Sequence, residues 1–321
     1  MRAGLIVIGG GPGGYVAAIR ARQLGMSVTL IERDELGGTC LNRGCIPTKA
    51  YYQQAEILRT LRELESFGIS GAEGKLDMAA SLARKDGIVN RITGGVASLL
   101  KGYDIPVVRG SARIVAPGRV AVGEEVLEAE RILIATGSVN RPLPIPGAEL
   151  PCVLDSTGLL ELDHIPPRLA IIGGGVIGIE FAGIFSSFGS QVSVIEAANA
   201  IISGQDGEIS KRLTAYLKRQ KIDVLTDAKV EGIAAAAAGA GAVLSVTDRK
   251  GTQEIAADIV LLAAGRMPCT EGLGLEAVHI AMDGPFIKVD DKYETSQPGI
   301  FAVGDVIPGP MLAHLASEEG K

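Results

Sequence analysis

The sequence contains the same glycine-rich unit twice, in residues 5–32 and 169–196. Each copy begins with a short apolar run, continues with Gly-x-Gly-x-x-Gly and a helical pattern, and ends with a second apolar run closed by a carboxylate, Glu32 or Glu196. Strand, glycine turn, helix, strand and acidic residue in this order are typical of a βαβ unit that binds a dinucleotide. The duplication predicts an α/β protein with two Rossmann-like domains, and two bound dinucleotides imply that electrons pass between them.

The three glycines of each unit are expected to have separate roles. The first permits the tight turn, the second lets a pyrophosphate approach the backbone, and the third lets helix and strand pack closely. The helix N-terminus then holds the phosphates, and the carboxylate accepts hydrogen bonds from ribose hydroxyls. The residues in these positions are Gly9, Gly11, Gly14 and Glu32 in the first unit and Gly173, Gly175, Gly178 and Glu196 in the second.

Length and charge narrow the class of protein. The chain has 321 residues, enough for two or three domains, and a net charge of −6. Because no stripe of Lys or Arg stands out, nucleic acid is not an expected partner. No apolar run approaches the ~20 residues that span a bilayer, and the run over residues 5–8 is too short for a signal peptide. We therefore expect a soluble cytoplasmic protein with no membrane partner.

Two of the four cysteines, Cys40 and Cys45, lie five positions apart directly after the first unit. In the cytoplasm such a pair is more often catalytic or metal-binding than a structural disulfide. Pro47 lies at or near the start of a helix predicted over residues 49–67, so Cys45 is near a helix N-terminus, where a thiolate is favoured. The other two cysteines stand alone, so further metal ligands are lacking and a redox-active disulfide is the favoured interpretation.

The remaining patterns predict a regular alternation of helices and short strands. A strand that ends in Gly304-Asp305 can place a carboxylate on a polyol. Residues 234–242 are only Ala and Gly and are interpreted as a loose hairpin turn, with a buried helix as the alternative. Helices are expected over residues 78–100 and 208–220, and strands over residues 107–108, 112–115, 120–122, 131–135, 258–263 and 287–289.

The sequence resembles the two-dinucleotide flavoprotein disulfide reductases over residues 5–321. The string GGTCLNRGCIPTK of residues 37–49 is highly specific for that family. Its LNRGCIPTK portion, and PMLAH of residues 310–314, are of the lipoamide type. The resemblance implies an FAD-binding domain over residues 1–146, an NAD-binding domain over 147–270, and a return segment, 271–321, that completes a discontinuous FAD domain.

The resemblance also implies a role for each matching residue. Cys40 would be the outer, interchange thiol, Cys45 the inner thiolate that faces the flavin, and Lys49 would lie near the flavin and pair with Glu180. From the residues alone, Lys49 could equally be a solvated helix residue and Glu180 an acid in a first helical turn. The expected FAD residues are Gly9, Gly11, Gly14, Glu32, Gly38, Thr39, Lys49, Ala112, Thr136, Gly137, Asp305, Met311, Leu312, Ala313 and His314. The expected NAD residues are Gly173, Gly175, Gly178, Glu196, Val230, Ala264, Gly265 and Arg266.

The expected nicotinamide cofactor is NAD rather than NADP. Glu196 can accept hydrogen bonds from a free 2′-hydroxyl but would repel a 2′-phosphate, and no Arg follows closely to reverse that preference.

One part of the family pattern has no counterpart in this sequence. Family members carry a further C-terminal interface domain, which supplies most of the dimer contact and a His–Glu pair. None of His164, His279 and His314 stands in the corresponding His-Pro-Thr context. We therefore expect the chain to retain FAD and NADH chemistry but to turn lipoamide over poorly. Family members are homodimers, and a monomer is the alternative for this chain.

The resulting hypothesis is a flavin-dependent disulfide oxidoreductase of the dihydrolipoyl-oxidising type. Electrons would pass from a reduced lipoyl group through Cys40 and Cys45 and FAD to NAD. The expected partner is lipoamide or a lipoyl-bearing protein of a 2-oxo acid dehydrogenase or glycine cleavage system. Two alternatives are a non-catalytic FAD- and NAD-binding module and another disulfide reductase, of the glutathione or mercuric type.

Overall fold

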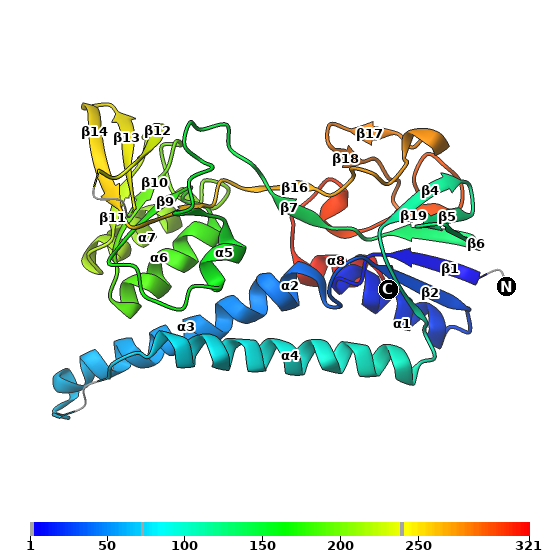
Figure 1. Cartoon of the computed structure of the whole chain (residues 1–321), viewed down its shortest axis with the longest axis horizontal. Coiled ribbons are helices and arrows are strands. Elements are labelled where there is room, and N and C mark those ends of the chain that lie inside the picture. The colour runs from blue at the N-terminus through cyan, green and yellow to red at the C-terminus, as the bar shows by residue number, and fades with distance from the viewer. Residues whose placement is uncertain (1–2, 72–73, 238–240) are drawn as a thin grey trace. The chain divides into compact units, whose positions relative to one another are not determined.

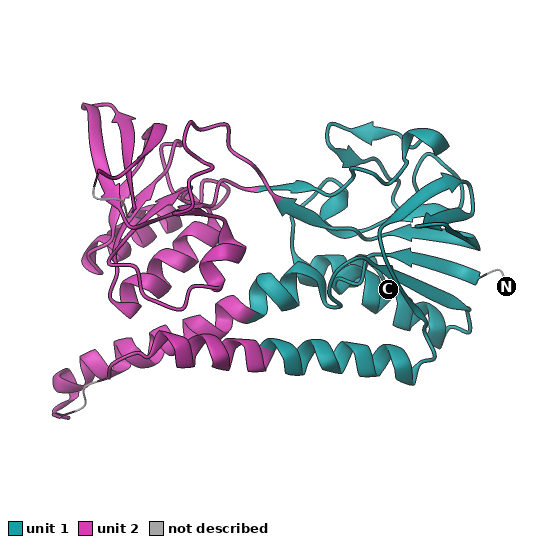
Figure 2. Cartoon of the chain, viewed as in Figure 1, with its two compact units in different colours: residues 1–46, 89–139, 266–321 teal, residues 47–88, 140–265 magenta. Residues whose placement is uncertain are grey.

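The computed structural model describes residues 3–71, 74–237 and 241–321. It divides into two compact units (Figure 2). Unit 1 comprises residues 1–46, 89–139 and 266–321, and unit 2 comprises residues 47–88 and 140–265. Each unit is described by itself.

Unit 1 is built on a seven-stranded sheet whose order is β3-β2-β1-β6-β5-β4, with β19 paired to β6 (Figure 1). The pairs β1–β2, β1–β6, β2–β3 and β6–β19 are parallel, and β4–β5 and β5–β6 are antiparallel. Helix α1 connects β1 to β2, so the predicted first βαβ unit is confirmed. The elements are β1 (Ala3–Ile8), α1 (Pro12–Gln23), β2 (Val28–Glu32), β3 (Val107–Arg109), β4 (Ala112–Ala116), β5 (Arg119–Val122), β6 (Glu125–Ile134) and β19 (Ile300–Ala302).

The central strand of unit 1 is buried on both faces. Leu5 and Val7 belong to a core formed with the small side chains of α1, whereas Ile6 and Ile8 belong to a second core formed with β4–β6 and the C-terminal segment. Because successive side chains of a strand point to opposite faces, this continuous apolar run fills both cores.

Unit 2 repeats the arrangement. Its five-stranded sheet has the order β11-β10-β9-β15-β8, and every pair in it is parallel. Leu169 and Ile171 of β9 face a core shared with α6, whereas Ala170 and Ile172 face the core of an antiparallel sheet, β12-β13-β14. The elements are β8 (Val153–Leu154), α5 (Ser156–Leu160), β9 (Arg168–Ile172), α6 (Val176–Phe188), β10 (Gln191–Ile195), α7 (Gly207–Arg219), β11 (Asp223–Leu225) and β15 (Ile259–Leu262).

The Ala- and Gly-rich segment lies in a hairpin, as predicted. Strands β12 (Lys229–Ala235) and β13 (Ala242–Asp248) are antiparallel, and Ala235 is the partner of Ala242. Residues 238–240, at the tip of the predicted turn, lie outside the described residues. Strand β14 (Gly251–Ala257) completes this sheet.

The long helices α3 (Cys45–Glu63) and α4 (Met78–Gly102) pass from one unit to the other. The sequence-based division assigned residues 47–88 to the FAD domain, but they cluster with unit 2. Their buried residues, Tyr51, Leu58 and Met78 among them, share a core with the aromatic side chains of α6.

The remaining elements are short. They are α2 (Gly38–Arg43), η1 (Leu64–Phe67), β7 (Ser138–Asn140), β16 (Arg266–Pro268), η2 (Glu276–Val278), β17 (Met282–Asp283), β18 (Phe286–Ile287), η3 (Gly304–Val306) and α8 (Ala313–Glu319). Strand β7 pairs with β16, and β17 pairs with β18. Among the described helices, none has the length and apolar character needed to cross a membrane.

A buried lysine joins the helices of unit 2. The Lys85 side chain is 2% exposed, and its Nζ lies 2.7 Å from Glu161 Oε1 and 2.9 Å from Asp86 Oδ1. Lys85 and the Tyr51 hydroxyl both donate to the Leu160 carbonyl, at 3.2 and 3.0 Å. Burial is the main cause of a raised pKa at Tyr51, so its hydroxyl keeps its proton. One carbonyl thereby ties α3 and α4 to the end of α5.

We predict that packing of the Lys85 stem, rather than its charge, contributes most to stability. Both acidic partners are about half exposed and can be hydrated without the ammonium group. Lys85→Ala should lower the free energy of unfolding by about 2–4 kcal/mol, as other truncations that leave a cavity do. Lys85→Met, which fills the same space, should cost about 1 kcal/mol or less. Urea unfolding of both variants is the measurement, and equal losses would contradict the prediction.

Candidate active site

In the first glycine loop, contacts within the protein require glycine at positions 9 and 14 but not at position 11. Gly9 has a φ of +107°, and a Cβ on it would overlap the Ala135 carbonyl. A Cβ on Gly14 would overlap the Gly9 carbonyl oxygen, so that helix α1 can approach β1 only because Gly14 has no side chain. A Cβ on Gly11, in contrast, would have its nearest neighbour, Gly38 Cα, 3.8 Å away.

In the second loop, contacts within the protein again require only the first and third glycines. Gly173 has a φ of +113°, and a Cβ there would meet the Ala263 carbonyl. A Cβ on Gly178 would overlap the Gly173 carbonyl oxygen, but a Cβ on Gly175 would meet nothing within 4 Å. The protein itself therefore does not require glycine at position 175. A ligand that must approach the backbone closely would require it.

The N-termini of α1 and α6 are suited to hold anions. Their N-cap residues, Gly11 and Gly175, provide no side-chain cap, and neither helix has an acidic residue in its first turn. The first N–H groups of each helix are thus available to an anion, which the helix dipole also favours. The glycine positions and these two helix ends fit the pyrophosphate of a dinucleotide.

The two carboxylates that close the units have matching environments. Glu32 Oε2 accepts the Gly10 N–H at 2.6 Å and its Oε1 accepts the Asp34 N–H at 2.7 Å. Glu196 Oε2 accepts the Gly174 N–H at 2.6 Å and its Oε1 accepts the Ala198 N–H at 2.7 Å. A carboxylate has about four acceptor positions. Each side chain is therefore held in place beside its glycine loop with capacity left for ribose hydroxyls.

The cysteine segment consists of two helices joined by one residue. Cys40 lies in α2 and is half-buried, and Cys45 is the first residue of α3 and is exposed. Between the helices, a Cβ on Gly44 would lie 2.9 Å from the Thr39 carbonyl oxygen and 3.3 Å from Cys40 Cα. The start of α3 at Cys45 agrees with the expected helix N-terminus. Helix α2 was missed, because six residues are too few to show a periodic pattern.

Helix α2 is anchored on the first glycine loop. The Gly37 N–H donates to the Gly10 carbonyl at 2.8 Å. Gly38 has a φ of +57°, and a Cβ on it would lie only 2.7 Å from Gly11 Cα. The expected phosphate-binding loop and the helix that carries Cys40 are therefore parts of one site in unit 1.

Tyr15 is a neighbour of Cys40 that the sequence did not indicate. It is half-buried in α1, and burial followed by the negative charge of Cys40 raises its pKa. A tyrosine inside an otherwise ordinary helix carries no signal that would have marked it.

Lys49 and Glu180 form an ion pair, as the resemblance implies. Lys49 Nζ lies 2.6 Å from Glu180 Oε1, and the two side chains are 58% and 33% exposed. Glu180 lies one position beyond the first turn of α6, so it is not a first-turn acid. An exposed pair contributes little to stability, about 0–1 kcal/mol. Its geometry therefore matters more for where the ammonium group is held, one helical turn after Cys45 on α3.

The other predicted FAD residues of unit 1 lie mostly at chain segments that follow strands. Thr136 and Gly137 follow β6, and Thr136 Oγ1 donates to the Cys269 carbonyl at 2.8 Å. Asp305 lies in η3, just after β19, and its Oδ2 accepts a hydrogen bond from Ser138. Ala112 is the first residue of β4, Thr39 lies in α2, Met311 and Leu312 precede α8, and Ala313 and His314 are its first residues.

The predicted NAD residues are less uniformly placed. Ala264 and Gly265 follow β15 in unit 2, but Arg266 belongs to unit 1, where it donates to Ser138. The Val230 side chain is buried in the core of the antiparallel sheet, so only its backbone could contact a ligand.

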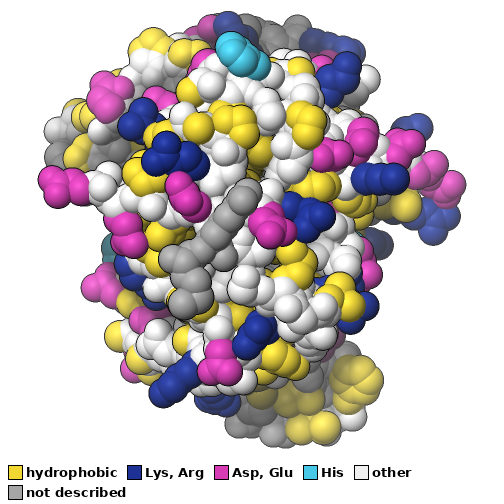
Figure 3. Space-filling model, turned by 90° about the vertical axis from the view of Figure 1, so that its right-hand side faces the viewer, with side chains coloured by type: hydrophobic (Ala, Val, Ile, Leu, Met, Phe, Trp, Pro, Cys, Tyr) yellow, Lys and Arg dark blue, Asp and Glu magenta, His cyan; other side chains and the backbone are white. Residues whose placement is uncertain are grey.

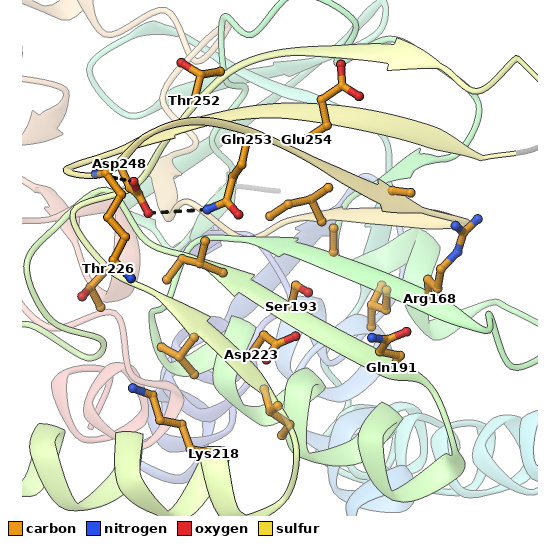
Figure 4. A pocket seen from close by; sticks show the side chains of 18 of the residues that line it. Arg168, Gln191, Ser193, Lys218, Asp223, Thr226, Asp248, Thr252, Gln253 and Glu254 are labelled. Atoms are coloured by element: carbon orange, nitrogen blue, oxygen red, sulfur yellow. Dashed lines mark hydrogen bonds between the residues drawn. The ribbon is translucent and has the colours of Figure 1, made fainter.

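A cavity of about 930 Å³ lies elsewhere in unit 2 (Figure 4). Its walls come from the amino-terminal parts of β9 and β10, from β11 and from the β13–β14 hairpin, and they include Arg168, Ser193 and Gln253. None of the predicted site residues lines it.

On the face of the molecule drawn in Figure 3, Lys and Arg side chains lie among Asp and Glu side chains.

We predict that one alanine substitution in the second loop lowers mainly the stability of the protein and that another lowers mainly its affinity for NADH. Gly178→Ala should lower the melting temperature markedly, because the new Cβ overlaps the Gly173 carbonyl. Gly175→Ala should lower stability by only about 0.5–1 kcal/mol, since alanine has room there although it is a poorer N-cap residue than glycine. It should nevertheless weaken NADH binding by about 10-fold or more, because a methyl group blocks the approach of the pyrophosphate. Thermal unfolding and NADH fluorescence titration are the two measurements. Unchanged NADH affinity in Gly175→Ala would argue against this loop as the binding site.

Comparison with known proteins agrees with this geometry. The family model described as "Pyridine nucleotide-disulphide oxidoreductase" matches residues 4–320. The dihydrolipoyl dehydrogenase of Thermus scotoductus is 43% identical over 98% of this chain and 68% of its own length. Mitochondrial dihydrolipoyl dehydrogenase 1 of Arabidopsis thaliana is 39% identical over 98% of this chain and 64% of its own length. The chain thus spans about two thirds of the length of these relatives.

A solved structure with the same fold is the Cu(II) complex of the HOCl-induced flavoprotein disulfide reductase RclA from Escherichia coli. It has a TM-score of 0.88 and 31% sequence identity, and the match covers 100% of this chain and 69% of that one. These relatives confirm the predicted α/β fold and the predicted type of enzyme. FAD and NAD(H), the cofactors expected from the sequence, are those that flavoprotein disulfide reductases and dihydrolipoyl dehydrogenases use. The chain belongs to the pyridine nucleotide-disulphide oxidoreductase family.

Proposed function

We propose that this chain passes electrons between a lipoyl dithiol and NAD by way of Cys40, Cys45 and FAD. The observation that carries the proposal is the anchoring of α2 on the first glycine loop. The helix bearing Cys40 begins where Gly38 touches Gly11, so a dinucleotide held by that loop would lie next to the cysteine pair.

The chemistry assigned to the cysteines is thiol–disulfide exchange. A thiolate of the reduced lipoyl group attacks Cys40 of the Cys40–Cys45 disulfide, and Cys45 leaves as a thiolate. The second lipoyl thiol then displaces Cys40, so that the lipoyl disulfide forms and both cysteines are reduced. FAD, when bound, supplies the carrier that accepts this electron pair and passes it to NAD as a hydride. The N-terminus of α3 favours Cys45 as the thiolate, because the helix dipole is positive there.

Lys49 and Glu180, both in unit 2, are assigned a positioning role, as the resemblance implies. The Glu180 carboxylate favours a position of the Lys49 ammonium group 2.6 Å from its Oε1, although both side chains are accessible to solvent. A fixed positive charge favours nearby negative charge, and the resemblance implies that the flavin ring lies there.

The partners are assigned from the relatives. Several are dihydrolipoyl dehydrogenases by name, which supports lipoamide or a lipoyl-bearing protein as the disulfide partner. A 2-oxo acid dehydrogenase or glycine cleavage system would provide such a protein. A cytoplasmic location and a homodimeric or monomeric state remain predictions.

The assignment of the cysteines can be tested by counting thiols. When the FAD-loaded protein is reduced by NADH without oxygen, the reactive thiols should increase by about two per FAD, because one disulfide takes up two electrons. Neither Cys40→Ser nor Cys45→Ser should show this increase, although NADH should still bleach the flavin in both. Cys152→Ser, which changes a cysteine in unit 2, is the matched control and should behave like the wild type.

Other outcomes would favour the alternatives. A flavin that NADH does not bleach would indicate a non-catalytic binding module. A thiol increase that persists in Cys45→Ser would show that another pair of cysteines is reduced.

We further predict a preference for NADH over NADPH that depends on Glu196. Glu196→Ser should lose about 10-fold in kcat/KM for flavin reduction by NADH, the effect of removing a charged hydrogen-bond acceptor. The same change should improve the use of NADPH, because a negative charge beside the 2′-phosphate is removed. Steady-state reduction of an artificial acceptor by each nucleotide measures both effects. A wild-type protein that prefers NADPH would instead indicate a reductase of the glutathione or mercuric type.

A further inference from the structure

A chain of hydrogen bonds in unit 1 connects three residues that lie far apart in the sequence. Arg266 donates from Nε to Ser138 Oγ at 2.7 Å and from Nη2 to the Ser138 carbonyl at 2.6 Å. The Ser138 hydroxyl donates in turn to Asp305 Oδ2 at 2.6 Å. Ser138 is 7% exposed, so water competes little for these bonds.

The direction of this chain is fixed by the chemistry of its two ends. The Arg266 guanidinium has donors only, and a carboxylate such as that of Asp305 has acceptors only. The Ser138 hydroxyl has a single hydrogen, which it must direct at Asp305 while it accepts from Arg266. Hydrogen bonds to charged groups are shorter and stronger than neutral ones, so both bonds restrain the Asp305 side chain.

The backbone at both ends of this series of hydrogen bonds is also restrained by hydrogen bonds of its own. Ser138 and Arg266 are the first residues of β7 and β16, which pair with each other. Next to Asp305, the Gly304 N–H donates to Glu319 Oε2 at 2.6 Å. Asp305 is thus fixed through its side chain by Ser138 and through its neighbouring backbone by Glu319.

We propose that Ser138 is a positioning residue that holds the Asp305 carboxylate ready to accept hydrogen bonds from the ribityl hydroxyls of FAD, with Arg266 orienting the Ser138 hydroxyl. Ser138 takes up part of one carboxylate oxygen and leaves the other oxygen for the polyol. The inference rests on the proposed function, because it needs FAD in unit 1. It also gives Arg266, expected from the sequence to be an NAD residue, a role on the flavin side.

The first measurement is the FAD affinity of the apoprotein, followed by flavin fluorescence. Ser138→Ala should bind FAD about 10-fold more weakly, because the carboxylate loses the donor that orients it. Ser138→Thr keeps the hydroxyl and should restore at least half of the lost affinity on a logarithmic scale. Ser98→Ala is the matched control in unit 1, since the Ser98 hydroxyl donates to the Gly94 carbonyl within α4, and it should bind FAD like the wild type.

A double-mutant cycle separates positioning from general stabilisation. If Ser138 acts through Asp305, the variants Asp305→Ala and Ser138→Ala/Asp305→Ala should bind FAD equally. Additive losses in the double variant would overturn the proposal, as would unchanged affinity in Ser138→Ala. Ser138→Cys, which keeps the size but donates weakly, replaces Ser138→Ala in the cycle if that variant does not fold. A wild-type apoprotein that fails to bind FAD would overturn the proposed function itself, which distinguishes the two failures.

Discussion

The structure depends on two places where a helix lies directly against the carbonyl group of the glycine that follows the preceding strand, Gly9 or Gly173. At Gly14 and at Gly178 even a single methyl group would overlap that carbonyl oxygen. This close approach places the first turn of α1 and of α6 next to the ends of their strands, and the N-cap residues Gly11 and Gly175 make no side-chain hydrogen bond to the first N–H groups. The position of each carboxylate, Glu32 or Glu196, and the anchoring of α2 follow from it, because all are hydrogen-bonded to the same loops or packed on them.

The position of helix α3 is also constrained by its packing in the core of unit 2. Helix α3 begins with Cys45, but its next turns are buried in the core of unit 2, where Tyr51 lies edge-on to Phe188 with ring centroids 5.9 Å apart. Two residues before Tyr51, Lys49 meets Glu180 of the same helix as Phe188. Packing between α3 and α6 therefore fixes the Lys49–Glu180 pair, and a loss of packing at Tyr51 would move the charged pair as well.

Much of this organisation could be predicted because it is local in the sequence. Glycine spacing, apolar runs and terminal carboxylates specify both βαβ units, and the Cys40–Cys45 spacing singled out the redox segment. What could not be predicted depends on contacts between distant residues. Ser138 and Asp305 are separated by 167 positions, and Lys85 and Glu161 by 76, so no pattern in either segment indicates its partner. For the same reason the sequence did not indicate that residues 47–88 cluster with unit 2, since the buried face of α3 is defined only by the helix it packs against.

The joint at Gly44 has a consequence for the reduced protein. Four residues separate Cys40 from Cys45, and three of them belong to helix α2. Bringing the two sulfur atoms together therefore closes a very small ring with almost no freely rotating backbone, and the entropic cost of closing it is low. The effective concentration of one sulfur at the other is correspondingly high. When the reduced protein reacts with a foreign disulfide, Cys45 therefore attacks Cys40 Sγ in the resulting mixed disulfide, so that the Cys40–Cys45 disulfide forms and the partner leaves as a thiol.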